Sequence, residues 1–227
     1  MIDTLLFDLD NTLLDFDKAE ANALTKALGD VGITVTDEMR GSYNKINLAQ
    51  WKLLEQGRIT REEVKIRRFK LLFQKFDIKV SPEEVAKAYQ RYLGQGHYFI
   101  DGAEEVLQQL SKKYRIYLVT NGTLSVQRGR LKSSGIQKYL QGVFISEEIG
   151  FNKPSIEYFN KCFAQIPDFK KENTVIIGDS LSSDIQGGKN AGIQTIWFHR
   201  PQDQTKNPQP KPDYEIRSLK SLLKMLE

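Results

Sequence analysis

The sequence predicts an α/β fold in which a doubly wound parallel sheet carries an all-helical insertion. Two observations support this prediction. From Ile100 onward, short apolar runs alternate with segments of helical apolar spacing, which is typical of βαβ units. Residues from about 16 to 94 contain helical spacing and almost no strand pattern. We therefore expect a discontinuous sheet domain at residues 1–15 and 95–227, and a helical domain at residues 16–94.

Strands are expected at short apolar runs that are rich in branched and aromatic residues. The first run lies between Ile2 and Phe7. The later runs are Ile116–Thr120, Val143–Ser146, Val175–Gly178 and Thr195–Phe198, with a short addition at Tyr214–Ile216. Gly135 and Gly192 are each followed by isoleucine, which predicts helices that end in the left-handed conformation. A closing helix is expected over Ser218–Leu226.

The insertion is expected to hold four helices. Apolar spacing marks the first three at Leu24–Val31, Trp51–Leu54 and Ile66–Phe76. Ser81 and Pro82 predict the start of the fourth, because serine caps a helix N-terminus and proline suits the first helical position. The densest basic stretch, Lys65 to Lys70, follows two glutamates and is interpreted as a solvated helix face.

Composition excludes several classes of protein. A chain of 227 residues with one cysteine, Cys162, has no internal disulfide framework and no multi-cysteine zinc site. Cys162 shares a helix face with apolar residues and is expected in the core. The formal charge of +4 is spread without a long run of one sign, which argues against a nucleic-acid polymer as partner. Without a signal peptide or membrane span, we expect a soluble cytoplasmic protein.

Polar side chains follow four of the predicted strands. Asp8 and Asp10 leave the first strand together, and two carboxylates about 4 Å apart repel by roughly 4 kcal/mol at an effective dielectric constant near 20. We therefore expect a cation there. The other clusters are Thr120-Asn121-Gly122, Lys153-Pro154, and Gly178-Asp179 with Asp184. Because open α/β sheets bind ligands at the carboxyl ends of their strands, the clusters predict one shared site.

Each cluster also has a simpler interpretation when it is taken alone. The two N-terminal aspartates could form a turn and a helix cap. Thr120-Asn121-Gly122 could be a strand-to-helix turn in which Gly122 supplies a positive φ. Lys153 could be a surface lysine, and Asp184 could cap the helix that follows it.

In their order and context, the four clusters resemble the motifs of the haloacid dehalogenase-like (HAD) hydrolase superfamily, from Ile2 to about Phe198. This resemblance implies a Rossmann-like core with an inserted cap of the first cap class, which closes over the site. Haloacid dehalogenases lack an acid at the position of Asp10. The resemblance therefore favours a phosphatase or phosphomutase over a dehalogenase.

The resemblance also implies a mechanism. Asp8 would be the nucleophile and would form an aspartyl-phosphate. Asp10, in its protonated form, would donate to the leaving oxygen and later take a proton from the attacking water. Lys153 would offset the charge of Asp8 and of the phosphoryl group, with Pro154 beginning a helix. The phosphoryl oxygens would be bound by Lys153 and by the Thr120-Asn121-Gly122 segment.

Mg²⁺ is the cofactor that the resemblance implies, with Mn²⁺ or Co²⁺ as substitutes. Its protein ligands would be Asp8, Asp179 and the main-chain carbonyl of Asp10, because Mg²⁺ prefers hard oxygen ligands. Thr12 and Asp184 would support these ligands from behind. Asp184 is expected to hold Lys153 or a metal-bound water.

Several segments resemble one subfamily, the noncanonical pyrimidine 5′-nucleotidases. These segments are Asp15-Phe16, Asn47–Trp51, Gln56–Thr60 and Ile145–Gly150. The implied substrates are nucleoside monophosphates such as dUMP, UMP and dTMP. Phe16, Tyr43 or Trp51 could stack on a pyrimidine, and Asn47 could pair with its edge. Packing inside the cap is the alternative for each aromatic residue.

Other functions compete with this interpretation. The same site could serve a phosphatase of phosphoglycolate or a sugar phosphate, or a phosphomutase. A phosphorylated switch that resembles response-regulator receivers is disfavoured by the helical insertion and by the clusters at Lys153 and Gly178. An inert scaffold is disfavoured because every expected catalytic position is filled. The sequence leaves open the oligomeric state and the physiological substrate.

Overall fold

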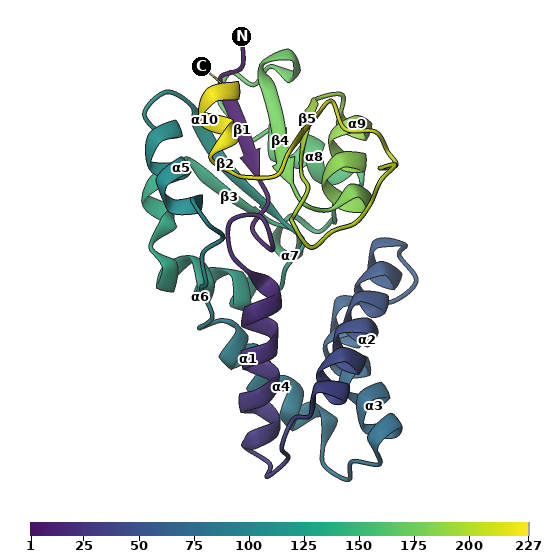
Figure 1. Cartoon of the computed structure of the whole chain (residues 1–227). Helices are drawn as coiled ribbons and strands as arrows, with labels where there is room; N and C mark the ends of the chain where they lie inside the picture. The colour runs from purple at the N-terminus through teal and green to yellow at the C-terminus, as the bar shows by residue number, and fades with distance from the viewer. Residues whose placement is uncertain (227) are drawn as a thin grey trace.

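A six-stranded parallel sheet, in the order β3-β2-β1-β4-β5-β6, forms the centre of the chain (Figure 1). The computed structural model describes residues 1–226. The strands are β1 (Thr4–Phe7), β2 (Arg115–Thr120), β3 (Gly142–Ile145), β4 (Thr174–Gly178), β5 (Gln194–Phe198) and β6 (Tyr214–Ile216). The strand order reverses at β1, since β2 and β3 lie on one side of it and β4 to β6 on the other. Such a reversal opens a crevice at the carboxyl ends of the strands.

The strand register brings the polar clusters to one edge of the sheet. Phe7 of β1 lies opposite Leu118 of β2 and Ile177 of β4. The residues that come next along these strands therefore leave the sheet together. This is why Asp8 and Asp179 can meet, although the chain separates them by most of its length.

Helices cover both faces of the sheet. One face carries α5 (Ala103–Leu110), α6 (Leu124–Ser134) and α10 (Ser221–Met225), and the other carries α8 (Ile156–Phe163) and α9 (Gln186–Ala191). Strand β1 shows the alternation, because Leu5 and Phe7 join the first apolar cluster while Leu6 joins the second. Cys162 is buried in the second cluster, as expected.

Short elements complete the core. They are α7 (Ser146–Ile149) and the turns η1 (Ile136–Tyr139), η2 (Lys171–Asn173) and η3 (Leu181–Ile185). Gly135 and Gly192 end α6 and α9 with φ values of 70°, which confirms the predicted left-handed helix ends. Ser146 was expected in a strand but begins α7. The closing helix is also shorter than expected, because residues 218–220 form a turn before it.

Pro154 does not begin a helix, contrary to the expectation. The next helix, α8, starts two residues later, where the hydroxyl of Ser155 accepts a hydrogen bond from the amide of Tyr158. Ser155 is therefore the N-cap, because it satisfies an amide that has no partner within the helix. The peptide bond between Lys153 and Pro154 is cis.

The helical insertion consists of α1 (Phe16–Gly29), α2 (Asp37–Glu55), α3 (Arg61–Phe76) and α4 (Pro82–Leu93). Each helix begins with a side-chain cap, from Asp15, Thr36, Thr60 and Ser81 respectively. In Figure 1 these helices lie below the carboxyl edge of the sheet, and we call residues 16–93 the cap. The cap has its own apolar cluster, which includes Val126 of α6. This separate cluster lets the cap pack largely on itself.

Polar side chains are also buried inside the cap. Arg68 is 3% exposed, donates to the side-chain oxygen of Asn47 at 3.0 Å, and lies over the ring of Tyr89. Asn47 in turn donates to the carboxylate of Glu20 at 2.5 Å. The interpretation of the basic stretch as a solvated face is therefore wrong for Arg68, because Glu20 and the ring of Tyr89 compensate its charge inside the cap.

Arg61, the first residue of α3, ties the cap to the core. Its guanidinium donates to the main-chain oxygens of Asn121 at 2.6 Å and Gly122 at 3.2 Å. It also donates to the hydroxyl of Ser146 at 2.7 Å and to the side-chain oxygen of Asn152 at 2.6 Å. Charge-assisted hydrogen bonds of this kind are stronger than neutral ones. The structure therefore holds the cap against the strand ends.

No helix within residues 1–226 is long and apolar enough to cross a membrane.

Replacing Phe69 with alanine should destabilise the cap. The Phe69 ring is fully buried and packs on Tyr43 and Tyr89 at centroid distances of 5.3 and 5.4 Å, so its loss should lower the free energy of unfolding by about 3–5 kcal/mol. Urea denaturation would measure the change. The matched control is Leu71→Ala on the same helix, where the side chain is 36% exposed and the loss should stay within about 1 kcal/mol. Equal losses in the two variants would contradict the packing described.

Candidate active site

Lys153 is buried between two carboxylates at the carboxyl edge of the sheet. Its ammonium donates to Asp8 at 2.6 Å, to Asp184 at 2.7 Å and to the main-chain oxygen of Val119 at 2.8 Å. Three acceptors satisfy all three donors of the ammonium. Burial alone would lower the pKa of Lys153, but Asp184 and Asp8 outweigh burial and raise this pKa above its usual value. Lys153 is therefore a fixed cation and not a surface lysine.

Asp8 and Asp179 carry charge that the protein only partly compensates. Burial raises the pKa of Asp8 to about 7, against the opposing charge of Lys153 and with support from Asp184 and Asp10. Burial also raises the pKa of Asp179 well above its usual value, and the charges of Asp8 and Asp184 add to this effect. A divalent cation would relieve both carboxyls.

The loop that carries Asp179 is fixed by its main chain. Its amide donates to the hydroxyl of the buried Thr12 at 3.1 Å, and its carbonyl accepts from the indole of Trp197 at 2.8 Å. Thr12 thus lies behind Asp179, where the sequence analysis expects it to act. The Asp179 carboxylate lies 3.4 Å from the guanidinium of Arg200, which also pairs with Asp17 of the cap at 2.8 Å.

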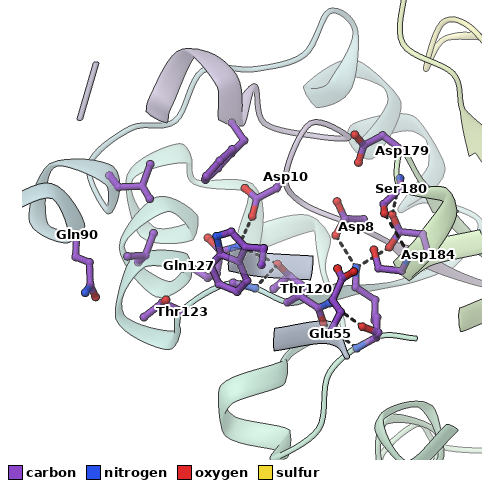
Figure 2. Close-up of a pocket in the computed structure, with 18 of the residues that line it drawn as sticks. Asp8, Asp10, Glu55, Gln90, Thr120, Thr123, Gln127, Asp179, Ser180 and Asp184 are labelled. Atoms are coloured by element: carbon purple, nitrogen blue, oxygen red, sulfur yellow. Dashed lines mark hydrogen bonds and ion pairs between the residues drawn. The ribbon is translucent and has the colours of Figure 1, made fainter. Parts of the chain in front are cut away.

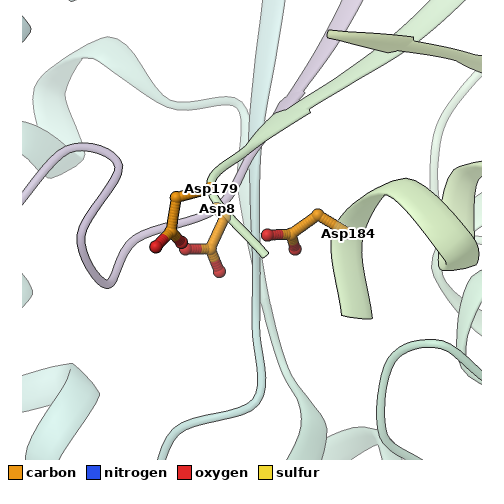
Figure 3. A group of neighbouring side chains, drawn as sticks. All are labelled: Asp8, Asp179 and Asp184. Atoms are coloured by element: carbon orange, nitrogen blue, oxygen red, sulfur yellow. The ribbon is translucent and has the colours of Figure 1, made fainter. Parts of the chain in front are cut away.

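Three carboxylates converge on one point. Single oxygens of Asp8, Asp179 and Asp184 lie within 4.8 Å of one another, and Figure 3 shows the three side chains together. Hard oxygen ligands suit Mg²⁺, and the raised pKa values of Asp8 and Asp179 fit a site that lacks a compensating cation. Asp184 is the least available of the three, because it accepts from Lys153 and from the amide of Ser180 at 3.0 Å. Asp8 and Asp179 remain as the carboxylates that could hold a metal.

The turn that carries Asp184 has an irregular conformation. Residues 181–185 form a single π-helical turn, an element that is frequent at functional sites. A Cβ atom on Gly178 would lie 2.3 Å from the carboxylate carbon of Asp184. Glycine at position 178 is therefore what allows Asp184 to approach Lys153. The simpler interpretation of Asp184 as only a helix cap does not account for this contact.

Asp10 has two partners that the sequence analysis missed. One of its carboxylate oxygens accepts from Arg130, and the other accepts from the amide of Gln127 at 2.7 Å. A guanidinium and an amide thus donate to the two oxygens of Asp10, and each oxygen keeps a second site for a proton or another hydrogen bond. Gln127 and Arg130 lie three positions apart and so share one face of α6.

The Thr120-Asn121-Gly122 segment forms a rigid turn beside Asp8. The hydroxyl of Thr120 accepts from the amide of Gln127 at 2.8 Å. Asn121 donates to the main-chain oxygen of Lys153 at 2.9 Å and accepts from its main-chain amide at 2.8 Å. Gly122 has no positive φ, but a Cβ atom there would lie 2.2 Å from the Gln127 side chain. The glycine is required by this close contact and not by an unusual backbone conformation.

A cavity of about 860 Å³, which includes open space at its mouth, lies between these residues and the cap (Figure 2). Asp8, Asp10 and Asp179 border it from the core. Of the residues predicted to select the substrate, Phe16 and Trp51 border it from the cap. A concave site lined by aromatic and apolar side chains with a few polar groups suits a small-molecule ligand.

The predictions for Tyr43 and Asn47 as substrate contacts are wrong. Tyr43 is fully buried and packs on Phe69 and Tyr89, and neither Tyr43 nor Asn47 borders the cavity. Both lie on the α2 face that points into the cap, where the side chain of Asn47 is bound to Glu20 and Arg68. Trp51 is one helical turn further along the same helix and reaches the cavity.

Four further cap residues that sequence reasoning missed border the cavity, namely Glu55, Arg68, Gln90 and Leu93. Glu55 lies at the end of α2, and burial together with the charge of Asp184 raises its pKa. Figure 2 shows Glu55 directed toward the core carboxylates. Arg68 borders the cavity from inside the cap. These residues could not be found from sequence spacing, because their roles depend on how the cap meets the core.

Comparison with known proteins agrees with this geometry. The family described as haloacid dehalogenase-like hydrolase matches residues 5–198. The chain is 42% identical to the pyrimidine 5'-nucleotidase PynA of Streptococcus pneumoniae over 224 residues, which cover 98% of this chain and 94% of that protein. It is 29% identical to the pyrimidine 5'-nucleotidase YjjG of Escherichia coli over 227 residues, with coverage of 99% and 97%.

A third relative is also similar in three dimensions. The HAD-hydrolase YfnB of Bacillus subtilis is 42% identical over 223 residues, covering 98% of this chain and 94% of that protein. Its crystal structure with bound magnesium has a TM-score of 0.94 to this chain at 41% identity, covering 100% of this chain and 99% of that one. With a family match over residues 5–198 and relatives of this similarity along nearly the whole chain, the protein belongs to the haloacid dehalogenase-like hydrolases.

Proposed function

We propose that the protein is a Mg²⁺-dependent phosphomonoesterase that acts through an aspartyl-phosphate on Asp8. We further propose pyrimidine nucleoside 5′-monophosphates, such as dUMP, UMP and dTMP, as its substrates. The observation that carries this proposal is the buried Lys153 ammonium held between Asp8 and Asp184 beside the cavity that the cap and core enclose. The relatives named as pyrimidine 5'-nucleotidases support the choice of substrate.

In the first step, Lys153 would supply a positive charge and Asp8 would supply the nucleophile. A phosphate monoester repels an ionised carboxylate, so a nearby positive charge is needed before the two can approach. The ammonium of Lys153 supplies this charge without moving, because its three hydrogen bonds already fix it. Its bond to one oxygen of Asp8, a residue that borders the cavity, leaves the other oxygen as the proposed nucleophile.

Asp8, Asp179 and the main-chain carbonyl of Asp10 would hold Mg²⁺. The metal, when bound, supplies positive charge for the phosphoryl oxygens. The proposed phosphate cradle is formed by the Thr120 hydroxyl and by the backbone around Asn121 and Gly122. These residues are immobilised by Gln127, Arg61 and the Lys153 backbone, so they need little reorganisation when charge develops.

Asp10 is proposed to act on the leaving group. It borders the cavity beside Asp8, because both residues follow shortly after the carboxyl end of strand β1. In the first step it would donate a proton to the leaving oxygen, and in the second it would accept a proton from the water that attacks the aspartyl-phosphate. To do either, the carboxylate must present an oxygen to the cavity.

The cap side of the cavity suits a flat ring that carries carbonyl groups. Phe16 and Trp51 offer aromatic faces, and Leu93 and Val126 add apolar surface. Arg68 adds hydrogen-bond donors, which match the carbonyl oxygens of uracil and thymine. This combination of apolar walls and a few polar groups favours a pyrimidine over an open-chain sugar phosphate.

Metal binding should stabilise the protein more at higher pH. A carboxyl whose pKa is higher in the folded state binds protons more tightly when folded, so the stability that it contributes is lost as pH rises through its folded pKa. For Asp8 this stability is lost between its usual pKa of 3.8 and its pKa of about 7 in the folded protein. The raised pKa of Asp179 acts in the same direction. We therefore expect Mg²⁺ to raise the melting temperature more at about pH 8 than at about pH 5.5. Calorimetry with and without EDTA would measure both shifts.

The variant Asp179→Asn provides the control for this experiment, since it should reduce the Mg²⁺ effect at both pH values. A Mg²⁺ shift that is independent of pH, or unchanged in Asp179→Asn, would contradict the proposed metal site.

A panel of phosphate esters tests the substrate. With Mg²⁺ present, we expect UMP, dUMP and dTMP to be hydrolysed with higher kcat/KM than phosphoglycolate or sugar phosphates. Replacing Trp51 with alanine should lower kcat/KM for these nucleotides about tenfold or more, because base stacking on an aromatic side chain contributes about 1–3 kcal/mol. The same variant should hydrolyse acetyl phosphate, which has no ring, at the rate of the unaltered protein.

Two controls accompany the panel. Asp8→Asn should abolish turnover of every ester, which excludes contaminating phosphatases. Leu48→Ala alters an exposed residue of the same helix and should change nothing. Preferential hydrolysis of sugar phosphates or phosphoglycolate would reject the pyrimidine assignment, and it would leave the phosphatase assignment intact.

A further inference from the structure

We propose that Arg130 is a positioning residue that couples the cap to the orientation of Asp10. This inference deepens the proposed phosphatase function and rests on the role of Asp10 in it. Arg130 lies on α6, is fully buried, and does not border the cavity. It therefore cannot act by touching the substrate. Its contacts instead join the proposed acid–base residue to both chain segments that connect cap and core.

The contact with Asp10 is part of a closed cluster. One guanidinium nitrogen of Arg130 donates both to the Asp10 carboxylate and, at 3.2 Å, to the side-chain oxygen of Gln127. The amide of Gln127 donates to the other carboxylate oxygen of Asp10 at 2.7 Å and to the hydroxyl of Thr120 at 2.8 Å. The direction of the Asp10 carboxylate is thus determined by two buried side chains of one helix.

The same guanidinium also holds the segment that returns from the cap. Its Nε donates to the main-chain oxygen of Gly96 at 2.9 Å, three residues after the end of α4. The neighbouring backbone is in close contact as well, because a Cβ atom on Gly129 would lie 2.6 Å from the carbonyl oxygen of Gly94. Helix α6 therefore rests directly on this connection.

The segment that enters the cap lies on another side of Arg130. Phe16, the first residue of α1, places its ring 5.8 Å from the guanidinium carbon. The two connections also pair with each other, since the amide of Asp15 donates to the carbonyl of Tyr98 at 2.7 Å. Arg130 is in contact with both connections at the point where any rotation of the cap must be absorbed.

A planar guanidinium transmits such a movement because its donors are fixed relative to one another. A shift of the Gly96 carbonyl must tilt the guanidinium plane. The tilt then changes the position of the N–H group that donates to Asp10. The remaining nitrogen, Nη2, is buried and has no hydrogen-bond partner among residues 1–226, so it is available for a new contact when the plane moves. Cap position and Asp10 orientation are therefore linked through one side chain.

Leaving-group dependence tests the positioning role. The substrates are aryl phosphates whose phenols differ only in acidity, from 4-nitrophenyl phosphate to phenyl phosphate, so no nucleotide preference enters. For Arg130→Met we expect kcat to fall about 100-fold with phenyl phosphate, because misplacing a catalytic group by about 1 Å can cost that much. With 4-nitrophenyl phosphate, whose leaving group needs little protonation, kcat should change less than about threefold. Arg130→Lys, which keeps the charge but not the planar fork, should lie between these limits.

The control is Arg128→Met, which alters an exposed arginine of the same helix that pairs with Glu148. It should leave the dependence on leaving-group acidity unchanged. An equal loss for all esters in Arg130→Met would show a merely structural role and would overturn the proposal, as would no loss. Failure of the pyrimidine assignment would appear only in the nucleotide panel.

A double-mutant cycle tests the coupling itself. Arg61→Ala removes the bonds that hold the cap against the core. If Arg130 transmits cap position, this change should make kcat more sensitive to leaving-group acidity when Arg130 is present. In the Arg130→Met background, Arg61→Ala should add no further sensitivity. An undiminished effect of Arg61→Ala in that background would overturn the proposed coupling.

Discussion

The site depends on one electrostatic constraint, the burial of the Lys153 ammonium between Asp8 and Asp184. An unpaired ammonium or carboxylate at this depth would be too costly to keep ionised. Each of the three groups therefore requires the others. Asp179 joins them, so three carboxyl groups converge beside one ammonium. The pKa values of Asp8 and Asp179 are raised as a result of burial and of the neighbouring carboxylates, and a bound cation would relieve this strain on both groups.

The parallel sheet brings the charged groups of the site together without long connecting loops. Strands β1, β2 and β4 are neighbours, so the residues that follow them meet without long loops. Tight contacts complete the arrangement, because Gly178 leaves room for Asp184 and Gly122 leaves room for Gln127. Rigid main-chain elements thus fix the groups that must not move, as a preorganised site requires.

The cap is built in a different way. It has its own apolar cluster, and polar contacts link it to the strand ends, chiefly through Arg61 and Arg200. Polar interfaces of this kind break and re-form more easily than apolar ones. In the proposed function, the core would hold the reacting groups in place, while the cap would bring Trp51 and Arg68 to the substrate. Arg130 contacts both the core residue Asp10 and the two segments that connect the core to the cap.

The sequence predicted the core better than the cap. Strand ends could be located because apolar runs stop abruptly at Asp8, Thr120 and Asp179, and a sheet brings such ends together. Helical spacing could not decide which face of α2 points outward, so both stacking on a substrate and packing inside the cap stayed open for Tyr43, which the structure buries inside the cap. Arg130 was missed because one polar residue on a helix gives no local signal of an ion pair to a residue 120 positions away.

Trapping of the proposed aspartyl-phosphate would show whether Asp8 becomes phosphorylated during turnover. The protein would be mixed with a phosphate ester and Mg²⁺, quenched during turnover, and treated with borohydride, which reduces an acyl phosphate to an alcohol. Mass spectrometry should find reduction at Asp8 alone and only with substrate. No reduction is expected in Lys153→Met, where Asp8 loses its fixed counter-charge. Rapid turnover of the ester without reduction at Asp8, or with reduction at another carboxylate, would contradict it.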